Sequence, residues 1–333
     1  MSTRSNMKIF SDQQLKPKIE QVLTQIEDRF LFHQNYDLKH PLALFNTSFN
    51  KVEESLQDFF KIYDGITFEQ LRQTQGGDIP VREIIKSYRA YLYSLREYLD
   101  DCYHVAKSFI APDKNNKDDR NQYNWLLKNA QIPAVQNFLN ATNDYKRFLD
   151  EIVNALKHNN AILNGIIFFD EATKEFYLGY YVANVVNERY EPVQSIHTDY
   201  QEEHTAFSFG RDVRFNTYHI FAVAEELMNM IKNLGIQVTI PSKSLPINEK
   251  RETLFKNIMN LPRMFFPDEY QKPVPSVSIT EDGLLKLECP SMLSLKPLPR
   301  PHSVMLYHSP DGKTRSFALL YYSDKKSIPA SGK

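Results

Sequence analysis

The chain is poor in cysteine and glycine and carries almost no net charge, and each of these shortages excludes something. Its two cysteines, Cys102 and Cys289, form no CxxC pair, which argues against a disulfide framework or a cysteine zinc site and fits a reducing compartment. Only 10 of its 333 residues are glycine, which suits a helical chain because glycine weakens helices. The formal net charge of −1 gives no global basic excess, so any contact with nucleic acid has to come from a local patch.

Several motifs and segments that would reveal a function are also missing. The chain contains no GxGxxG, no P-loop, no GxSxG elbow and no HExxH pair, which disfavours dehydrogenases, P-loop NTPases, α/β hydrolases and zincins. We therefore predict no cofactor. No apolar run approaches the roughly 20 residues of a membrane span, and the N-terminus shows no apolar signal region, so we expect a cytoplasmic protein without a membrane partner.

Two polar stretches have the residue types of a metal site without its spacing. Residues 111–122 resemble a calcium loop through Asp113, Asn115 and Asp118, but Lys117 stands where a ligand is needed and the turn glycine is absent. Residues 197–204 (HTDYQEEH) offer imidazoles and carboxylates, yet their spacing matches no ligand motif that we recognise. We interpret the first stretch as a polar loop and the second as a hydrated acidic loop, and we predict no metal.

Apolar residues at three- and four-residue spacing predict most of the chain to be helical. The strongest stripe starts at Val81 and continues to Phe109, and its length requires burial against partner helices. The aromatic share of 13%, with 22 Phe and 19 Tyr, supplies ample area for that core. The expected helices cover residues 15–36, 42–63, 81–109, a short segment around Trp125, 134–159, 213–234 and 249–260.

The pattern changes to strands in two places. Residues 163–169, 175–185 and 186–198 predict a β-meander between helices, and Asp-Gly turns predict hairpins at 277–288 and 304–322. We therefore expect an α+β fold, an N-terminal helical bundle with an inserted β-meander and a smaller β-containing C-terminal region. The expected domains are residues 1–240, with the β insert at 163–198, and residues 241–333, which begin at a Pro-rich linker.

The first candidate site is a polar face near the end of the 134–159 helix. Arg147, Glu151, Asn154 and His158 follow one another at helical spacing, so they share one side of the helix. A histidine exchanges protons near neutral pH, and it can act as acid or base on a phosphodiester. The alternative interpretation is a solvated polar face that finishes the helix.

This arrangement resembles the HEPN (higher eukaryotes and prokaryotes nucleotide-binding) superfamily over residues 80–235. In that family an arginine, often followed by asparagine, precedes a histidine on a late helix of the bundle. Asn154 and His158 match this pattern, whereas Val153 takes the place of the family arginine and Arg147 lies on the same face at another spacing. The resemblance implies a metal-independent ribonuclease of toxin–antitoxin or phage-defence systems that acts as a homodimer, with Lys157 beside the RNA.

A second candidate is the segment Gly210-Arg211-Asp212-Val213-Arg214. Two arginines beside a helix N-terminus are able to hold an anion such as an RNA phosphate. The alternative, which we favour, is that Asp212 is an ordinary N-cap with surface arginines nearby.

Taken with the resemblance, these residues predict an effector or binding component of a bacterial defence or toxin–antitoxin-like system, acting through RNA or a partner protein. The alternatives are a ribonuclease that uses His158, with Arg147 or Arg211 in place of the missing cation, and a non-enzymatic scaffold.

Overall fold

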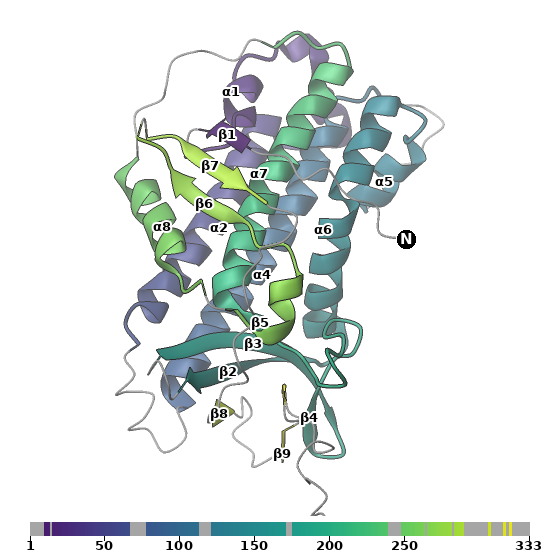
Figure 1. Cartoon of the computed structure of the whole chain (residues 1–333). Coiled ribbons are helices and arrows are strands. Elements are labelled where there is room, and N and C mark those ends of the chain that lie inside the picture. Colours follow the sequence, from purple (N-terminus) through teal and green to yellow (C-terminus); the bar gives the residue numbers. More distant parts are fainter. Residues whose placement is uncertain are drawn as a thin grey trace, which may run out of the picture.

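Long helices standing side by side form the body of the molecule in the computed structural model (Figure 1). The structure describes residues 10–13, 15–66, 78–112, 121–170, 175–238, 248–263, 265–281, 283–289, 306–307, 316–317 and 320–321. The four longest helices described are α2 (Pro41–Tyr63), α4 (Asp78–Lys107), α6 (Pro133–His158) and α7 (Phe209–Asn233). Shorter helices flank them: α1 (Ile19–Leu23), α5 (Gln122–Lys128) and α8 (Glu249–Asn260). Apolar residues on their facing sides pack into one continuous core.

A twisted sheet lies across one end of this bundle (Figure 1). Its order is β8-β2-β3-β4-β9, with β5 also paired to β3. The bounds are β2 (Ile162–Asp170), β3 (Glu175–Val186), β4 (Arg189–Pro192), β5 (Phe207–Ser208), β8 (Leu306–Tyr307) and β9 (Ser316–Phe317). A second sheet of order β1-β7-β6 is formed by β1 (Phe10–Gln13), β6 (Ser276–Ile279) and β7 (Leu285–Glu288). These elements confirm the predicted α+β fold, with helices at the N-terminal side and an antiparallel meander, β2-β3-β4, between α6 and α7.

Core residues from both sides of residue 240 belong to a single cluster. Leu254 and Phe255 of α8 and Leu285 and Leu287 of β7 are buried in the same core as α2, α4 and α7. Phe221 of α7 meets Phe255 at a ring-centroid distance of 6.1 Å. The C-terminal region is therefore joined to the bundle by apolar packing in addition to the chain connection.

The strand expected at 186–198 is shorter, as β4 (Arg189–Pro192), and α4 begins three residues earlier than expected. Three other predicted elements also differ from the structure. The helix expected at 15–36 is broken into α1 and two 3-10 turns (Asp28–Phe30 and His33–Tyr36), and its second half makes hydrogen bonds to the residues that follow α4 in addition to its own short turns. The amide of Phe32 donates to the carbonyl of Ser108 at 2.7 Å, and the hydroxyl of Tyr36 donates to the carbonyl of Ile110 at 2.9 Å. Helix α7 begins four residues earlier than predicted, at Phe209.

The third difference concerns the hairpin expected at 304–322. Strand β8 pairs with β2, and β9 pairs in parallel with β4, so the two strands extend opposite sides of the large sheet instead of pairing with each other. The hairpin at 277–288 is confirmed as the antiparallel pair β6-β7. The sequence also predicts a loop at 74–78 and a disordered tail at 328–333. Residues 74–77 of that loop, the whole linker at 241–246 and this tail lie outside the described residues.

A buried carboxylate lies where α4, α7 and β3 meet. Asp212 of α7 is fully buried, and its Oδ2 accepts hydrogen bonds from the hydroxyls of Tyr88 at 2.5 Å and Tyr180 at 2.7 Å. The amide of Asn216 donates to the same oxygen at 3.2 Å, and Asn216 in turn accepts from Tyr145 of α6. This network connects three helices and the sheet through polar contacts inside an apolar core.

Glycine at position 165 allows β2 to approach α4 closely. A Cβ atom there would lie 2.4 Å from Cγ1 of Val81 and 3.2 Å from Cγ1 of Ile85. We expect Gly165→Ala to lower the free energy of unfolding by about 1–3 kcal/mol, the usual cost of overpacking. Gly65→Ala is the control, since its Cβ would find only ordinary contacts of 3.5 Å and beyond. Urea unfolding of both variants checks this, and equal stability would contradict the close packing.

Candidate nucleic-acid interface

Three basic side chains form a stripe along the outer face of α4. Arg82, Lys86 and Arg89 are spaced by four and three residues, which places them on one side of the helix, and all three are exposed. They line a groove of about 440 Å³ between α4 and the start of β2. The rest of its lining consists of Ile85, Ala90, Tyr93, Ile162 and Leu163. We call this the α4 groove.

Lys157 of α6 extends the basic stripe across the helix boundary. Its Nζ lies 5.1 Å from the centre of the Tyr93 ring, and the guanidinium carbon of Arg89 lies 5.4 Å from the same centre. Both distances are within the range of cation–π attraction. Tyr93 thus brings two cations from different helices together, and the predicted RNA-contacting residue Lys157 lies beside the α4 groove, against its Tyr93 wall, without lining it.

In the part of the chain that the structure describes, the cations of the α4 groove have no carboxylate within ion-pairing distance. No ion pair there involves Arg82, Lys86, Arg89 or Lys157. By contrast, Arg96, farther along α4, is paired with both Asp100 and Asp150. Four cations around one groove concentrate a positive potential, which attracts phosphates and other anions.

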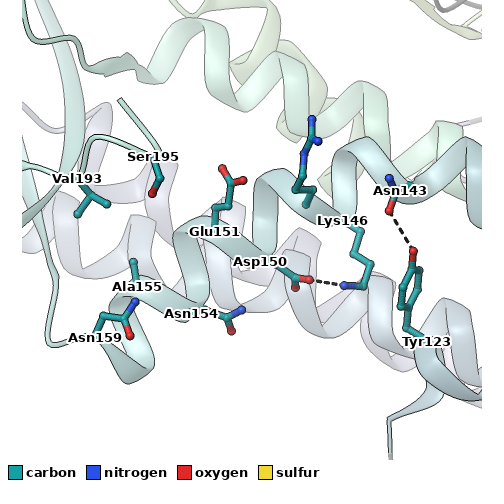
Figure 2. Close-up of a pocket in the computed structure, with 11 residues that line it drawn as sticks. Tyr123, Asn143, Lys146, Asp150, Glu151, Asn154, Ala155, Asn159, Val193 and Ser195 are labelled. Carbon is teal, nitrogen blue, oxygen red and sulfur yellow. Dashed lines mark hydrogen bonds and ion pairs between the residues drawn. The ribbon is translucent and has the colours of Figure 1, made fainter. Parts of the chain in front are cut away.

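A second groove of about 390 Å³ runs over the outer face of α6 (Figure 2). Arg147 and Asn154, two residues of the predicted catalytic face, line it together with Glu151, Asn159 and Ser195. Figure 2 shows that several other polar groups there are already paired, because Lys146 points to Asp150 and Tyr123 donates to Asn143 at 3.0 Å. The groove carries both signs of charge, so its field is weaker than that of the α4 groove.

His158 lies at the exposed end of α6 and lines neither groove. Arg147, three turns earlier on α6, has a side chain that is 70% exposed and lies 4.0 Å from the exposed carboxylate of Asp144. A contact of that length between exposed groups contributes little. The three residues of the predicted catalytic face therefore share one side of α6, and two of them line the same groove.

Arg211 and Arg214 are inside the protein, where their donors bind main-chain oxygens. Arg211 is 6% exposed, and its Nη2 donates to the carbonyl of Pro273 at 3.0 Å. Arg214 is 3% exposed and donates to the carbonyls of Gly210, Met259, Leu261 and Pro262 at 2.6 to 3.2 Å. Burial lowers the pKa of Arg214 to about 10. This geometry uses both guanidiniums to hold α7 against the C-terminal region, away from either groove.

The expectation that Asp212 is the N-cap of its helix is wrong. Ser208 is the N-cap of α7, and its hydroxyl oxygen accepts from the amide of Arg211 at 3.3 Å. The reason is that the helix extends back to Phe209, which moves Asp212 into the first turn and turns its side chain toward the tyrosines of the core.

His197, in the predicted acidic loop, has a structural role. The amide of Val182 donates to its Nε2 at 2.9 Å, and burial lowers the pKa of His197 to about 3, so the ring is neutral. His204 lies 3.1 Å from Asp199 at the surface. Within the described ranges no three or more His, Cys, Asp or Glu side chains gather as a metal site would require. Residues 113–118, the calcium-like stretch, lie outside those ranges.

Sequence reasoning missed the basic stripe, although its signal was present. The apolar stripe of α4 predicts the helix, and the face opposite that stripe carries the basic residues. Arg82, Lys86, Arg89 and Tyr93 repeat at steps of four, three and four residues on that face. What the sequence does not show is that β2 and Lys157 close the stripe into a groove.

Among the described residues, no helix combines the length and the apolar character needed to cross a membrane. Comparison of the chain with protein-family models, with curated proteins and with solved structures gives no match.

Proposed function

We propose that this protein binds RNA through the α4 groove. The observation that carries the proposal is the set of four cations around one groove with no carboxylate partner among the described residues. Phosphate contacts from Lys and Arg supply most of the affinity of proteins for nucleic acids. Arg82, Lys86 and Arg89 come from one helix, so the backbone that carries their charges is already ordered before RNA binds.

The choice of RNA among polyanions is supported by the partial resemblance of α6 to the HEPN pattern. Asn154 and His158 lie on the same helix as Lys157, which joins the groove from its other side. The wider role that this resemblance supports is that of a cytoplasmic effector or binding component of a bacterial defence or toxin–antitoxin-like system. In that role the protein would act as a homodimer or together with a partner protein.

Charge reversal within the groove tests the proposal. Lys86→Glu with Arg89→Glu is expected to weaken binding of a fluorescein-labelled RNA by about tenfold to a hundredfold, since two phosphate contacts become repulsive. Fluorescence anisotropy at fixed salt measures this. The control, Lys61→Glu with Lys256→Glu, changes net charge equally at exposed positions on α2 and α8. Equal loss in both double variants would show that only overall charge matters, and no binding by the native protein would end the proposal.

The second candidate, a ribonuclease that uses His158, is favoured by one observation. Arg147 and Asn154 line one groove, and His158 lies outside it on the same side of α6, so an RNA strand that runs along this side would pass a cation, an amide and an imidazole in turn. We expect purified protein to cleave RNA in EDTA and His158→Ala to lower the rate at least a hundredfold, the usual size of a general acid–base contribution. Intact RNA after incubation with the native protein, or an equal rate with His158→Ala, would leave RNA binding without catalysis.

A further inference from the structure

The floor of the α4 groove is apolar, which a site for bare phosphate does not require. Ile85 and Leu163 are core residues, 7% and 3% exposed, whose edges reach the groove. Ile162 is half-buried beside them, and Ala90 is exposed next to the basic stripe. The groove therefore offers charge on its rim and apolar surface beneath, which fits an anion that has an apolar body.

The extent of the apolar surface limits the shape of that body. The groove volume of about 440 Å³ lies in the range of small-molecule sites. The large apolar side chains that stay exposed in the described chain are Leu127, Val185 and Val186, and none of them lines the groove. A long acyl chain would extend past the apolar floor onto polar surface. A flat ring is small enough to contact only the apolar floor of the groove.

We propose that the α4 groove is a nucleotide site, in which the apolar floor takes one base and the cationic rim takes its phosphate. This inference rests on the proposed function, because it takes the α4 groove to be the surface that contacts RNA. The Tyr93 ring is already engaged by Arg89 and Lys157, so the base contacts the floor at Ala90 and Ile162. A free mononucleotide then occupies the same groove and competes with RNA.

Ala90 offers a substitution that changes the floor without changing charge or the fold. It is exposed on a helix, so Ala90→Leu fills the groove at a position where no core packing is disturbed. Ala141 is an exposed alanine on α6 that lines neither groove, and Ala141→Leu is the matched control for an added surface leucine.

Binding of a fluorescent N-methylanthraniloyl derivative of AMP to the full chain tests the site. We expect saturable binding that AMP displaces at least about tenfold more effectively than adenosine, which lacks the phosphate, or pyrophosphate and dodecyl phosphate, which lack the base, because losing either a charge-assisted hydrogen bond or the apolar contact lowers affinity by about tenfold. Ala90→Leu is expected to lose binding about tenfold on the same basis, and Ala141→Leu to retain it. Circular dichroism and urea unfolding verify that both variants are folded.

The outcomes separate the two proposals. If pyrophosphate displaces the probe as effectively as AMP, the apolar floor does not bind a base. If dodecyl phosphate displaces it more effectively, the groove binds alkyl phosphates. Native affinity in Ala90→Leu would also overturn the nucleotide site. RNA binding without AMP binding contradicts this inference alone, whereas AMP binding without RNA binding contradicts the proposed function and leaves the nucleotide site standing.

Discussion

Asp212→Ala is expected to lower the free energy of unfolding by about 3–5 kcal/mol, among the largest effects of a single substitution. The reason is that Oδ2 of Asp212 accepts from Tyr88, Tyr180 and Asn216, all of which are buried. Removing the acceptor leaves three donors without a partner in a site closed to water, and each such group costs about 1–3 kcal/mol. Urea unfolding followed through Trp125, the chain's single tryptophan, measures the loss.

Two companion variants isolate this cause. Asp58→Ala removes a carboxylate that is 65% exposed on α2, and a change within about 0.5 kcal/mol is expected there. Asp212→Asn keeps one oxygen acceptor, so it should retain part of the stability that alanine loses. A loss in Asp212→Ala no larger than in Asp58→Ala would contradict the network.

The same network predicts a pH dependence. Burial raises the pKa of Asp212 above its ordinary value, against the opposing effect of the hydrogen bonds from Tyr88 and Tyr180. A carboxyl whose folded-state pKa is raised stabilises the fold most at low pH, and this contribution declines as pH rises through the folded pKa. Asp212→Asn does not titrate. The stability of the native protein relative to this variant, measured by urea unfolding, should therefore be greatest at low pH and should fall as pH rises.

Arg214→Met is expected to cost about 2–4 kcal/mol, because a hydrogen bond to a charged group contributes about 1.5–3 kcal/mol and several are lost together. The Arg214 guanidinium donates to the carbonyls of Met259 and Leu261, at the C-terminal end of α8, and to that of Pro262 beyond it. These oxygens carry the negative end of the helix dipole and have no helical partner. Methionine keeps the length of the stem but leaves them unsatisfied.

Two readouts distinguish this structural role from the anion-binding role that the sequence suggested. Arg147→Met, at a side chain that is 70% exposed, should leave stability within about 0.5 kcal/mol. At a temperature where Arg214→Met is still folded, its RNA affinity should equal that of the native protein. Native-like stability together with weakened RNA binding would return Arg214 to the anion site.

The sequence predicted the helices of the bundle well because their apolar stripes are long. The expectations for α2, α6 and α8 agree with the structure to within one residue at either end, since each helix buries one face and is polar on the other. The prediction for 15–36 was wrong because the apolar spacing is helical, whereas Phe32 and Tyr36 bond to Ser108 and Ile110, just after α4, and the chain between makes only short turns. Contacts of that sequence separation leave no periodic signal.

The candidate sites were harder to predict for the same reason. The polar face of α6 followed from helical spacing, and Arg147 and Asn154 do line a groove. Burial of Arg211 and Arg214 depended on α8 and Pro273, segments 45 or more residues away in sequence. The α4 groove needed both the basic stripe and the position of β2 and Lys157, and only the first of these is visible in a single helix.

The salt dependence of RNA binding tests the central claim, that the cations of the α4 groove contact RNA phosphates. A plot of the logarithm of the binding constant against the logarithm of salt concentration has a slope of about −0.7 for each single-strand phosphate that a protein cation neutralises. Lys86→Gln with Arg89→Gln is therefore expected to flatten the native slope by about 1.4, while Lys61→Gln with Lys256→Gln leaves it unchanged. Equal slopes for the native protein and the groove variant would contradict the claim.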